Sequence, residues 1–463
     1  MWKRLLLAGV CYLMVGGAMA QGGSDTLHVD LKRVLEQTLL VSPDIQAARA
    51  NIHRANARYD LIRSSRILPD ASAMSAVAAV PGIENPNGTP RDELYLDPAV
   101  RNDYGNLRPF AQAELSLVQP IYTWGALGGA IEAASAGADL EDARARGTMI
   151  EASLRAARLY YDVLLTNELQ RLTDRAGDVV AMAMEEISRL LEEGNPDVDD
   201  ADRYQVLITE QEYQRRITEV IQERQTAHSA LRRQLSVPDS TRILPVRDTL
   251  EPLMFVLESL EYYQQKALMY RPEILQTQAA QVATGALVRV ARADYYPQTL
   301  FGLTFSVSGA TNRFRQSNPY VSDGFRRTSA RTGFGLRQKL NFGQTRARVA
   351  QAKAQSNSAG HLAAAAEQLV LAELEQAWRQ VTIEEVALAA QDSSLAISKE
   401  WLRVEQINFD LDLGDTENLV DAVQTNLTLE AGYYEAVSRY NMAILKLLAA
   451  AGVLTEEINS LTE

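Results

Sequence analysis

An uninterrupted helical pattern from Ala126 to Glu193 constrains this chain more than any other feature. This whole stretch contains no proline. Between Ile150 and Leu190 apolar side chains recur about every 3.6 residues, which keeps them on one face of an α-helix. At about 1.5 Å per residue the helix is roughly 100 Å long. A helix of that length does not fit inside one compact domain, so the sequence predicts a long rod whose apolar face needs neighbouring helices.

The segment before the long helix alternates apolar and polar residues and predicts a strand. The alternation runs from Phe110 to Val118. The apolar face consists of Ala111, Ala113, Leu115 and Leu117, and the polar face of Gln112, Glu114 and Ser116. A strand with two such faces suits a barrel wall with lipid outside and water inside.

The chain contains the same unit twice. Pro43-Asp44-Ile45 in the first half is echoed by Pro272-Glu273-Ile274 in the second half, and each motif starts a predicted helix. Trp124-Gly125 is echoed in the same way by Phe342-Gly343, and each pair precedes a long helix. The duplicated unit is helix, strand, strand, long helix, turn and return helix. The sequence therefore predicts a mainly α fold with a small β part.

These patterns also predict the boundaries of each part. Residues 1–20 are a secretory signal peptide, residues 237–252 a connector in the middle of the helical region, and residues 453–463 a polar C-terminal tail. The first repeat, 21–236, has strands at about 67–80 and 107–119, a long helix at about 126–193 and a return helix at about 199–235. The second repeat, 253–452, has strands at about 298–311 and 328–341, a long helix at about 344–413 and a return helix at about 417–451.

The N-terminus has the features of a secretory signal peptide. Lys3-Arg4 is followed by an apolar segment from Leu5 to Val15 and by Ala18-Met19-Ala20, a cleavage site of small residues. The only cysteine of the chain, Cys11, lies inside this segment. The mature protein is therefore expected to have no disulfide and no thiolate chemistry.

Composition argues against several functions. A formal net charge of −13 disfavours nucleic-acid binding. After the signal peptide no uncharged apolar stretch is long enough to span a bilayer, so no membrane-spanning helix is predicted. The histidines lack metal-ligand spacing, and no serine lies in a nucleophile-elbow motif. The histidines are His28, His53, His228 and His361. The sequence therefore predicts no enzyme, no metal site and no cofactor.

Two observations favour a membrane barrel built from several chains. Four predicted strands per chain cannot close a barrel without exposed edges, whereas a homotrimer supplies twelve. Aromatic residues cluster where strands meet helices, as an interfacial girdle against outer-membrane lipid would. They are Tyr122, Trp124, Tyr295, Tyr296 and Phe342. Ordinary core aromatics are the alternative interpretation of this cluster.

The chain resembles the TolC-like outer-membrane efflux proteins over nearly all of its mature length. The duplication, the segment Gln119–Gly125 and the two helix–turn–helix tips at Gly194 and Gly414 carry the resemblance. The resemblance implies a trimeric 12-strand β-barrel in the outer membrane that continues into a long periplasmic α-helical tunnel. It also implies a passive exit duct of a tripartite efflux or type I secretion system, joined to a periplasmic adaptor and an inner-membrane pump.

The resemblance also assigns roles to residues at the two acidic tips. Val420-Asp421-Ala422 resembles the stretch whose aspartate lines the periplasmic constriction of the family, and Asp200 resembles an acid of its gate network. Gln424 stands where a second family aspartate would, and Asp415 stands where a gate arginine is expected. The alternative interpretation is that these acids cap solvated helix ends.

Further roles follow from position. The family docks an adaptor hairpin beside the tip glycines Gly194 and Gly414, which are also suited to helix C-caps. Glu114, Arg337 and Lys339 are expected on polar strand faces and hence in the barrel lumen. A soluble periplasmic coiled-coil scaffold or adaptor is the alternative for the whole chain. It accounts for the helices but not for alternating strands at matching places in two repeats.

Overall fold

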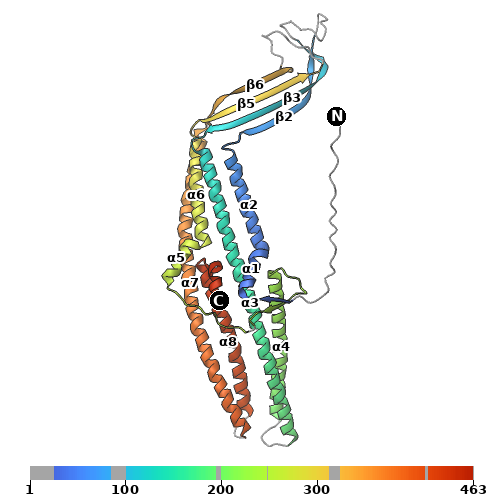
Figure 1. The fold of residues 1–463 in the computed structure, drawn as a ribbon, viewed down its shortest axis with the longest axis vertical. Coiled ribbons are helices and arrows are strands. Elements are labelled where there is room, and N and C mark those ends of the chain that lie inside the picture. The colour runs from blue at the N-terminus through green and yellow to red at the C-terminus, as the bar shows by residue number, and fades with distance from the viewer. Residues whose placement is uncertain are drawn as a thin grey trace. The chain divides into compact units, whose positions relative to one another are not determined.

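A computed structural model of the 463-residue chain describes residues 26–84, 101–193, 200–247, 249–311, 324–411 and 416–461 (Figure 1). The predicted signal peptide, with Cys11, lies outside the described residues. The elements up to the middle of the chain are β1 (Thr26–Val29), α1 (Leu31–Val41), α2 (Pro43–Ser64), β2 (Asp70–Ile83), β3 (Asn102–Tyr122), α3 (Ala126–Glu192), α4 (Asp200–Gln234) and β4 (Arg242–Pro245). Those that follow are α5 (Leu260–Tyr270), α6 (Pro272–Ala293), β5 (Gln298–Ala310), β6 (Arg327–Arg337), α7 (Phe342–Asp410), α8 (Thr416–Ala450) and α9 (Leu454–Leu461).

The duplicated pattern predicted from the sequence is confirmed by the lengths of corresponding helices. The helices α1 and α5 have 11 residues each, α2 and α6 have 22 each, and α4 and α8 have 35 each. The long helices α3 and α7 have 67 and 69 residues. Both 22-residue helices begin with a proline, Pro43 and Pro272, which starts a helix well because its φ is already helical and its missing N–H would have no partner there.

Four strands form one antiparallel sheet in the order β2-β3-β5-β6. The pair β3–β5 joins the two repeats, with Glu114 opposite Ser306 and Leu115 opposite Phe305. The strand β6 ends at Arg337, before the predicted end of this strand at about residue 341. The prediction that Lys339 lies on the strand is therefore wrong. After Arg337 the chain leaves the ladder, and side-chain hydrogen bonds from Gln338 and Lys339 to Tyr295 and Asp294 take over.

The chain divides into two compact units, and the first comprises Met1–Thr38, Ala156–Glu251 and Leu402–Glu435. A short parallel sheet lies in its core, where Val29 of β1 and Ile243 of β4 are fully buried. The sequence predicted helix and irregular connector at these two places. Each strand has only four residues, and its partner lies in a distant part of the chain, so no local periodicity reveals the pairing.

The helices α3 and α4 of the first unit contribute many of its buried side chains. Within α3, residues from Ala156 to Thr173 are buried on several faces, and not only along one apolar stripe. The helix α4 contributes the fully buried Leu231 and Leu235. A Cβ on Gly177 of α3 would overlap the Tyr213 hydroxyl, so the ring of this α4 residue occupies space that glycine leaves open.

The second unit comprises Leu39–Arg155, Pro252–Trp401 and Ala436–Glu463. Its helical core contains Leu374 of α7 and the run Ile444–Leu448 of α8, whose large apolar members are fully buried. The predicted polar tail instead forms α9, because Val453 and Leu454 are buried at its start. Gly452, with φ +77°, makes the turn before α9, and a Cβ there would lie 2.8 Å from the Tyr270 backbone.

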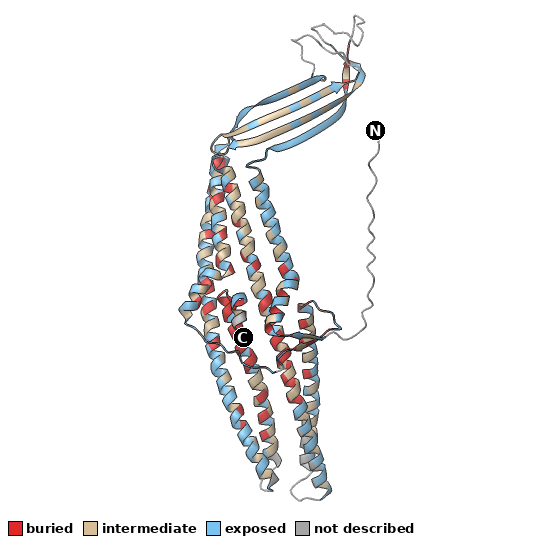
Figure 2. Cartoon of the chain, viewed as in Figure 1, coloured by how far each residue is buried: buried red, intermediate tan, exposed pale blue. Residues whose placement is uncertain are grey.

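Burial differs sharply between helices and sheet. Figure 2 shows buried residues along the helices and few in the four-stranded sheet. No helix within the described ranges is long and apolar enough to cross a membrane.

Candidate channel surfaces

One face of the four-stranded sheet carries no charge. The pairing register places odd-numbered residues of β2, β3 and β5 and even-numbered residues of β6 on this face. Its larger apolar members are Val77, Leu115, Leu117, Phe301, Leu303, Phe305, Val307, Phe334 and Leu336. Val77, Phe334 and Leu336 are 84%, 76% and 75% exposed. So large an uncharged apolar surface is typical of contact with lipid or another protein.

All charged residues in the continuous register lie on the other face. They are Asp70 of β2, Arg108 and Glu114 of β3, and Arg327, Arg331 and Arg337 of β6. Glu114 and Arg337 were expected on a polar strand face and lie there. The same face carries the hydroxyl groups of Ser306 and Ser329, whose Oγ atoms lie 2.8 Å apart across β5 and β6. This face is suited to contact with water.

Lys339 is held at the junction between β6 and α7. Its Nζ donates to the Asp294 carboxylate at 2.8 and 2.9 Å, just after the end of α6. Arg348 of α7 approaches the same carboxylate at 3.4 Å. The Asp294 carboxylate therefore links the end of α6 to Lys339 after β6 and to Arg348 of α7.

Three of the five predicted girdle aromatics contact one another where β3 meets α3. The Trp124 ring lies 5.0 Å from Tyr122 and stacks 4.8 Å from Tyr296. Its Nε1 donates to the Pro297 carbonyl at 2.8 Å. Trp124 has φ +54°, which is rare for a bulky residue, and Gly125 follows with φ +85°. The strained turn aims the indole at the start of β5.

The other two predicted aromatics lie at matching places in the second repeat. Tyr295 is half-buried, and its carbonyl accepts a hydrogen bond from Gln338. Phe342 is the first residue of α7 and is 48% exposed. All five lie at ends of the sheet strands or of the helices next to them, as an interfacial band requires.

The tip residues are described only in part. Gly194 and Gly414 lie outside the described residues, and Asp200 begins α4 without a described side chain. Asp421 and Gln424 of α8 are exposed, whereas Ala422 and Asn426 on the opposite side of the helix are buried. The protomer thus leaves Asp421 and Gln424 on its surface.

An ion pair that sequence analysis missed joins α3 to α8 in the first unit. An Arg175 Nη atom lies 2.6 Å from Glu430 Oε1, and the Glu430 side chain is only 10% exposed. The hydrogen bond to Glu430 raises the pKa of Arg175. These residues are 255 positions apart, and no motif marks either of them.

Nearby, a second carboxylate holds the connector. The Glu168 side chain is 5% exposed and accepts from Arg171 at 2.8 Å and from the Leu250 N–H at 3.0 Å. His228 of α4 lies 3.4 Å from the Asn167 side chain, to which Arg224 also donates. Burial, with Arg224, Arg232 and Arg242 nearby, lowers the pKa of His228 to about 4. His228 is therefore neutral near pH 7.

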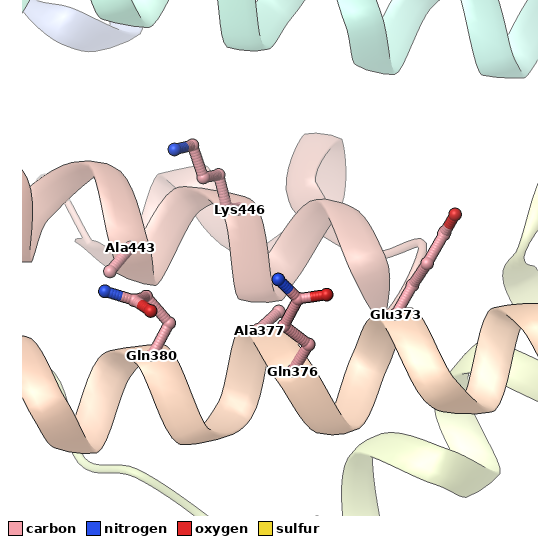
Figure 3. A pocket seen from close by; sticks show the side chains of 6 residues that line it. All are labelled: Glu373, Gln376, Ala377, Gln380, Ala443 and Lys446. Carbon is pink, nitrogen blue, oxygen red and sulfur yellow. The ribbon is translucent and has the colours of Figure 1, made fainter.

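A shallow groove of about 310 Å³ lies between α7 and α8 in the second unit (Figure 3). Its lining residues are Glu373, Gln376, Ala377, Gln380, Ala443 and Lys446. Glu373 is already bound by Arg271, whose Nη2 donates to it at 2.6 Å. In the described part of the chain, no group of three or more His, Cys, Asp or Glu side chains is placed to hold a metal ion.

Long helices in a duplicated arrangement, together with a four-stranded sheet that has one uncharged face, define the fold of this chain. Solved structures have this fold. A membrane protein from Pseudomonas aeruginosa matches with a TM-score of 0.74 and 18% identity, over 93% of this chain and 95% of that one. The open state of the Neisseria gonorrhoeae MtrE outer membrane channel matches with 0.71 and 16%, over 92% and 89%. The Campylobacter jejuni CmeC outer membrane channel matches with 0.71 and 14%, over 96% and 94%.

The sequence of the second repeat provides a separate similarity. Residues 264–452 match the family described as "Outer membrane efflux protein". This match covers most of the second repeat, so the predicted resemblance to TolC-like outer-membrane efflux proteins is supported by the sequence of that repeat and by the fold. No curated protein sequence matches the chain. Neither similarity points to the alternative of a soluble periplasmic scaffold or adaptor.

Proposed function

We propose that the protein acts as a homotrimer in which three four-stranded sheets close one 12-strand barrel. The observation that carries this proposal is the uncharged, exposed apolar face of the sheet, which water would not tolerate and lipid would. Within the described residues, β2 and β6 each have one edge without a strand partner, and pairing β6 of one chain with β2 of the next would satisfy both.

The test of this assembly is the mass of the detergent-extracted protein by light scattering. The expected particle contains three chains of up to 51.2 kDa each, and it leaves the membrane fraction only when detergent is added. A monomer that is released by salt alone would contradict the proposal.

The trimer is a passive exit duct that works with a periplasmic adaptor and an inner-membrane pump. The similarity of residues 264–452 to outer membrane efflux proteins supports this role. The adaptor docks beside the tips that contain Gly194 and Gly414. Deleting the gene should raise intracellular retention of the exported solute, and the wild-type gene should restore export. Restored export by a variant with both tips removed would contradict docking at the tips.

The constriction of the duct is formed at the tips, with Asp421 as its main acid and with Asp200 and Gln424 beside it. The exposure of Asp421 and Gln424 on the surface of the protomer supports this assignment, because side chains that line a pore must be free of the protomer's core. In the trimer the carboxylates converge and favour cations. The ion pair between Arg175 and Glu430 restrains the helix pairs that must move apart when the duct opens.

Conductance in planar bilayers tests the constriction. Replacing Asp421 with alanine should weaken both cation preference and block by a multivalent cation, because one carboxylate per chain is lost from the ring. Glu212→Ala is the control, since Glu212 is 71% exposed on α4 and carries the same charge. Unchanged selectivity in Asp421→Ala, or an equal change in the control, would remove Asp421 from the constriction.

A further inference from the structure

The charged face of the sheet has the opposite sign to the chain as a whole. The whole chain has 59 acidic and 46 basic residues. In the continuous register of the sheet, four arginines stand against two carboxylates, and all six lie on one face. The arginines are Arg108, Arg327, Arg331 and Arg337, and the carboxylates are Asp70 and Glu114. A protein that is acidic overall therefore concentrates positive charge at the surface suited to water.

The three arginines of β6 follow one another along the strand. At about 3.3 Å per residue, Arg331 lies roughly 13 Å from Arg327 and roughly 20 Å from Arg337. The residues opposite them on β5 are neutral: Ser308, Thr304 and Gln298. Arg337 donates to the Gln298 side chain at 3.3 Å.

Glu114 does not neutralise this row of arginines. It shares its level with Ser306 and Ser329, between the levels of Arg327 and Arg331. It lies on β3, two strands away from β6, which separates the backbones by roughly 10 Å. That distance is about one Debye length at physiological salt, so the attraction is strongly screened. Among the described residues none of the three β6 arginines is within ion-pair distance of a carboxylate.

We propose that this row of arginines makes the barrel an anion-attracting exit, so that the channel favours solutes bearing carboxylate or phosphate groups. The inference rests on the proposed trimer with its polar sheet face inward. Threefold symmetry repeats the row around the lumen, and guanidinium groups keep their charge at every physiological pH and bind carboxylate and phosphate through two parallel hydrogen bonds. The proposed acidic constriction at the tips favours cations and so opposes the arginine row. The effect of the row is therefore measured as the difference in ion selectivity between the wild type and variants.

The closing experiment compares purified full-length channels in planar bilayers under a KCl gradient. The variant R327Q/R331Q/R337Q should conduct, and its chloride-to-potassium permeability ratio should be at least about twofold lower than that of the wild type. Citrate added to one side should block the wild type. The citrate concentration that blocks the variant should be at least about tenfold higher. E114Q, on the same face, should shift the permeability ratio toward chloride.

A matched control removes three arginines from a helix. R54Q/R58Q/R63Q changes three exposed residues of α2 and alters the net charge by the same amount. An equal shift in this control, or an unchanged ratio in the β6 variant of a conducting channel, would overturn the inference and leave the proposed function standing. No conductance from the wild type would contradict the proposed function and the inference with it. If the triple variant does not assemble, R331Q and E114Q must shift the ratio in opposite directions, and equal ratios would overturn the inference.

Discussion

The four-stranded sheet and the helical first unit differ in how far their apolar residues are buried. In the first unit Val29, Leu231 and Ile243 are fully buried in a core. In the sheet, Phe334 and Leu336 of β6 are about three-quarters exposed, and the charged residues gather on the other face. The apolar residues of the first unit are removed from water by packing into a core. The apolar face of the sheet is not covered within the protomer and is suited to lipid or to another protein.

The two regions also differ in how their charged side chains are paired. In the first unit the carboxylates of Glu168 and Glu430 are almost fully covered, and each has an arginine within 2.8 Å. On the sheet, Arg331 has only neutral residues opposite it. A buried charge without a partner is costly, so the first unit pairs its charges, whereas an arginine on a surface in contact with water does not require a carboxylate partner.

The largest expected effect comes from the core of the first unit. Leu231→Ala should destabilise the protein by about 2–5 kcal/mol, because it removes buried methyl groups and leaves a cavity. Leu336→Ala in the sheet should cost under about 0.5 kcal/mol in detergent, because Leu336 is exposed in the protomer. Thermal melting followed by circular dichroism measures both changes. Equal losses would break the comparison.

The two faces of β3 provide the next test. Leu115→Arg places a charge on the uncharged face and should cost about 2–4 kcal/mol per chain at mid-membrane depth. The amount of trimer extracted from outer membranes should then fall sharply. Ser116→Arg, one residue along and on the other face, should leave this amount nearly unchanged. Equal loss in both variants would show that the uncharged face does not meet lipid.

The ion pair between α3 and α8 should contribute less. Glu430→Gln should lower stability by about 1–2 kcal/mol, since the Glu430 side chain is almost buried while that of Arg175 is 57% exposed. Asp421→Asn, on the exposed face of α8, is the matched control and should change stability little. A double-mutant cycle with Arg175→Met isolates the pair, and additive losses would show no coupling.

The smallest expected effect is a pH dependence from His228. Its folded pKa of about 4 lies below the ordinary value of 6.5. Above about pH 6.5 His228 is neutral in both states and does not lower the free energy of unfolding. As the pH falls from 6.5 toward 4, the unfolded chain binds a proton at His228 before the folded chain does, so the free energy of unfolding decreases. Allowing for solvent screening, the loss is about 1 kcal/mol. Melting temperatures of wild type and His228→Gln at pH 7 and pH 4.5 measure it, and parallel curves would contradict it.

Much of the architecture could be predicted because helices and strands produce periodic patterns of apolar residues along the sequence. The alternation around Glu114 predicts the strand β3 and its two faces, and the pattern from Ala126 onward predicts α3. Corresponding prolines at Pro43 and Pro272 predict the duplicated helices. These features depend on neighbours along the chain, which a sequence displays directly.

The candidate surfaces were predicted less completely. Arg327 lies one residue before the predicted start of the last strand, and Arg331 lies inside it, but neither was assigned a role. Only the pairing register shows that both share a face with Glu114. Lys339 was misplaced because a strand end depends on its pairing partner, and the Asp294 carboxylate captures its side chain after the ladder stops.

The sequence by itself determined the long helices, the alternating strands, the duplication and the segregation of charge from apolar residues within a strand. Each arises from the repeat distance of helix or strand, which acts over a few residues. Only the tertiary structure decided that β1 pairs with β4 and that Arg175 meets Glu430. Such contacts join segments far apart along the chain, and they form where packing of the whole chain brings compatible groups together, which no short stretch of sequence specifies.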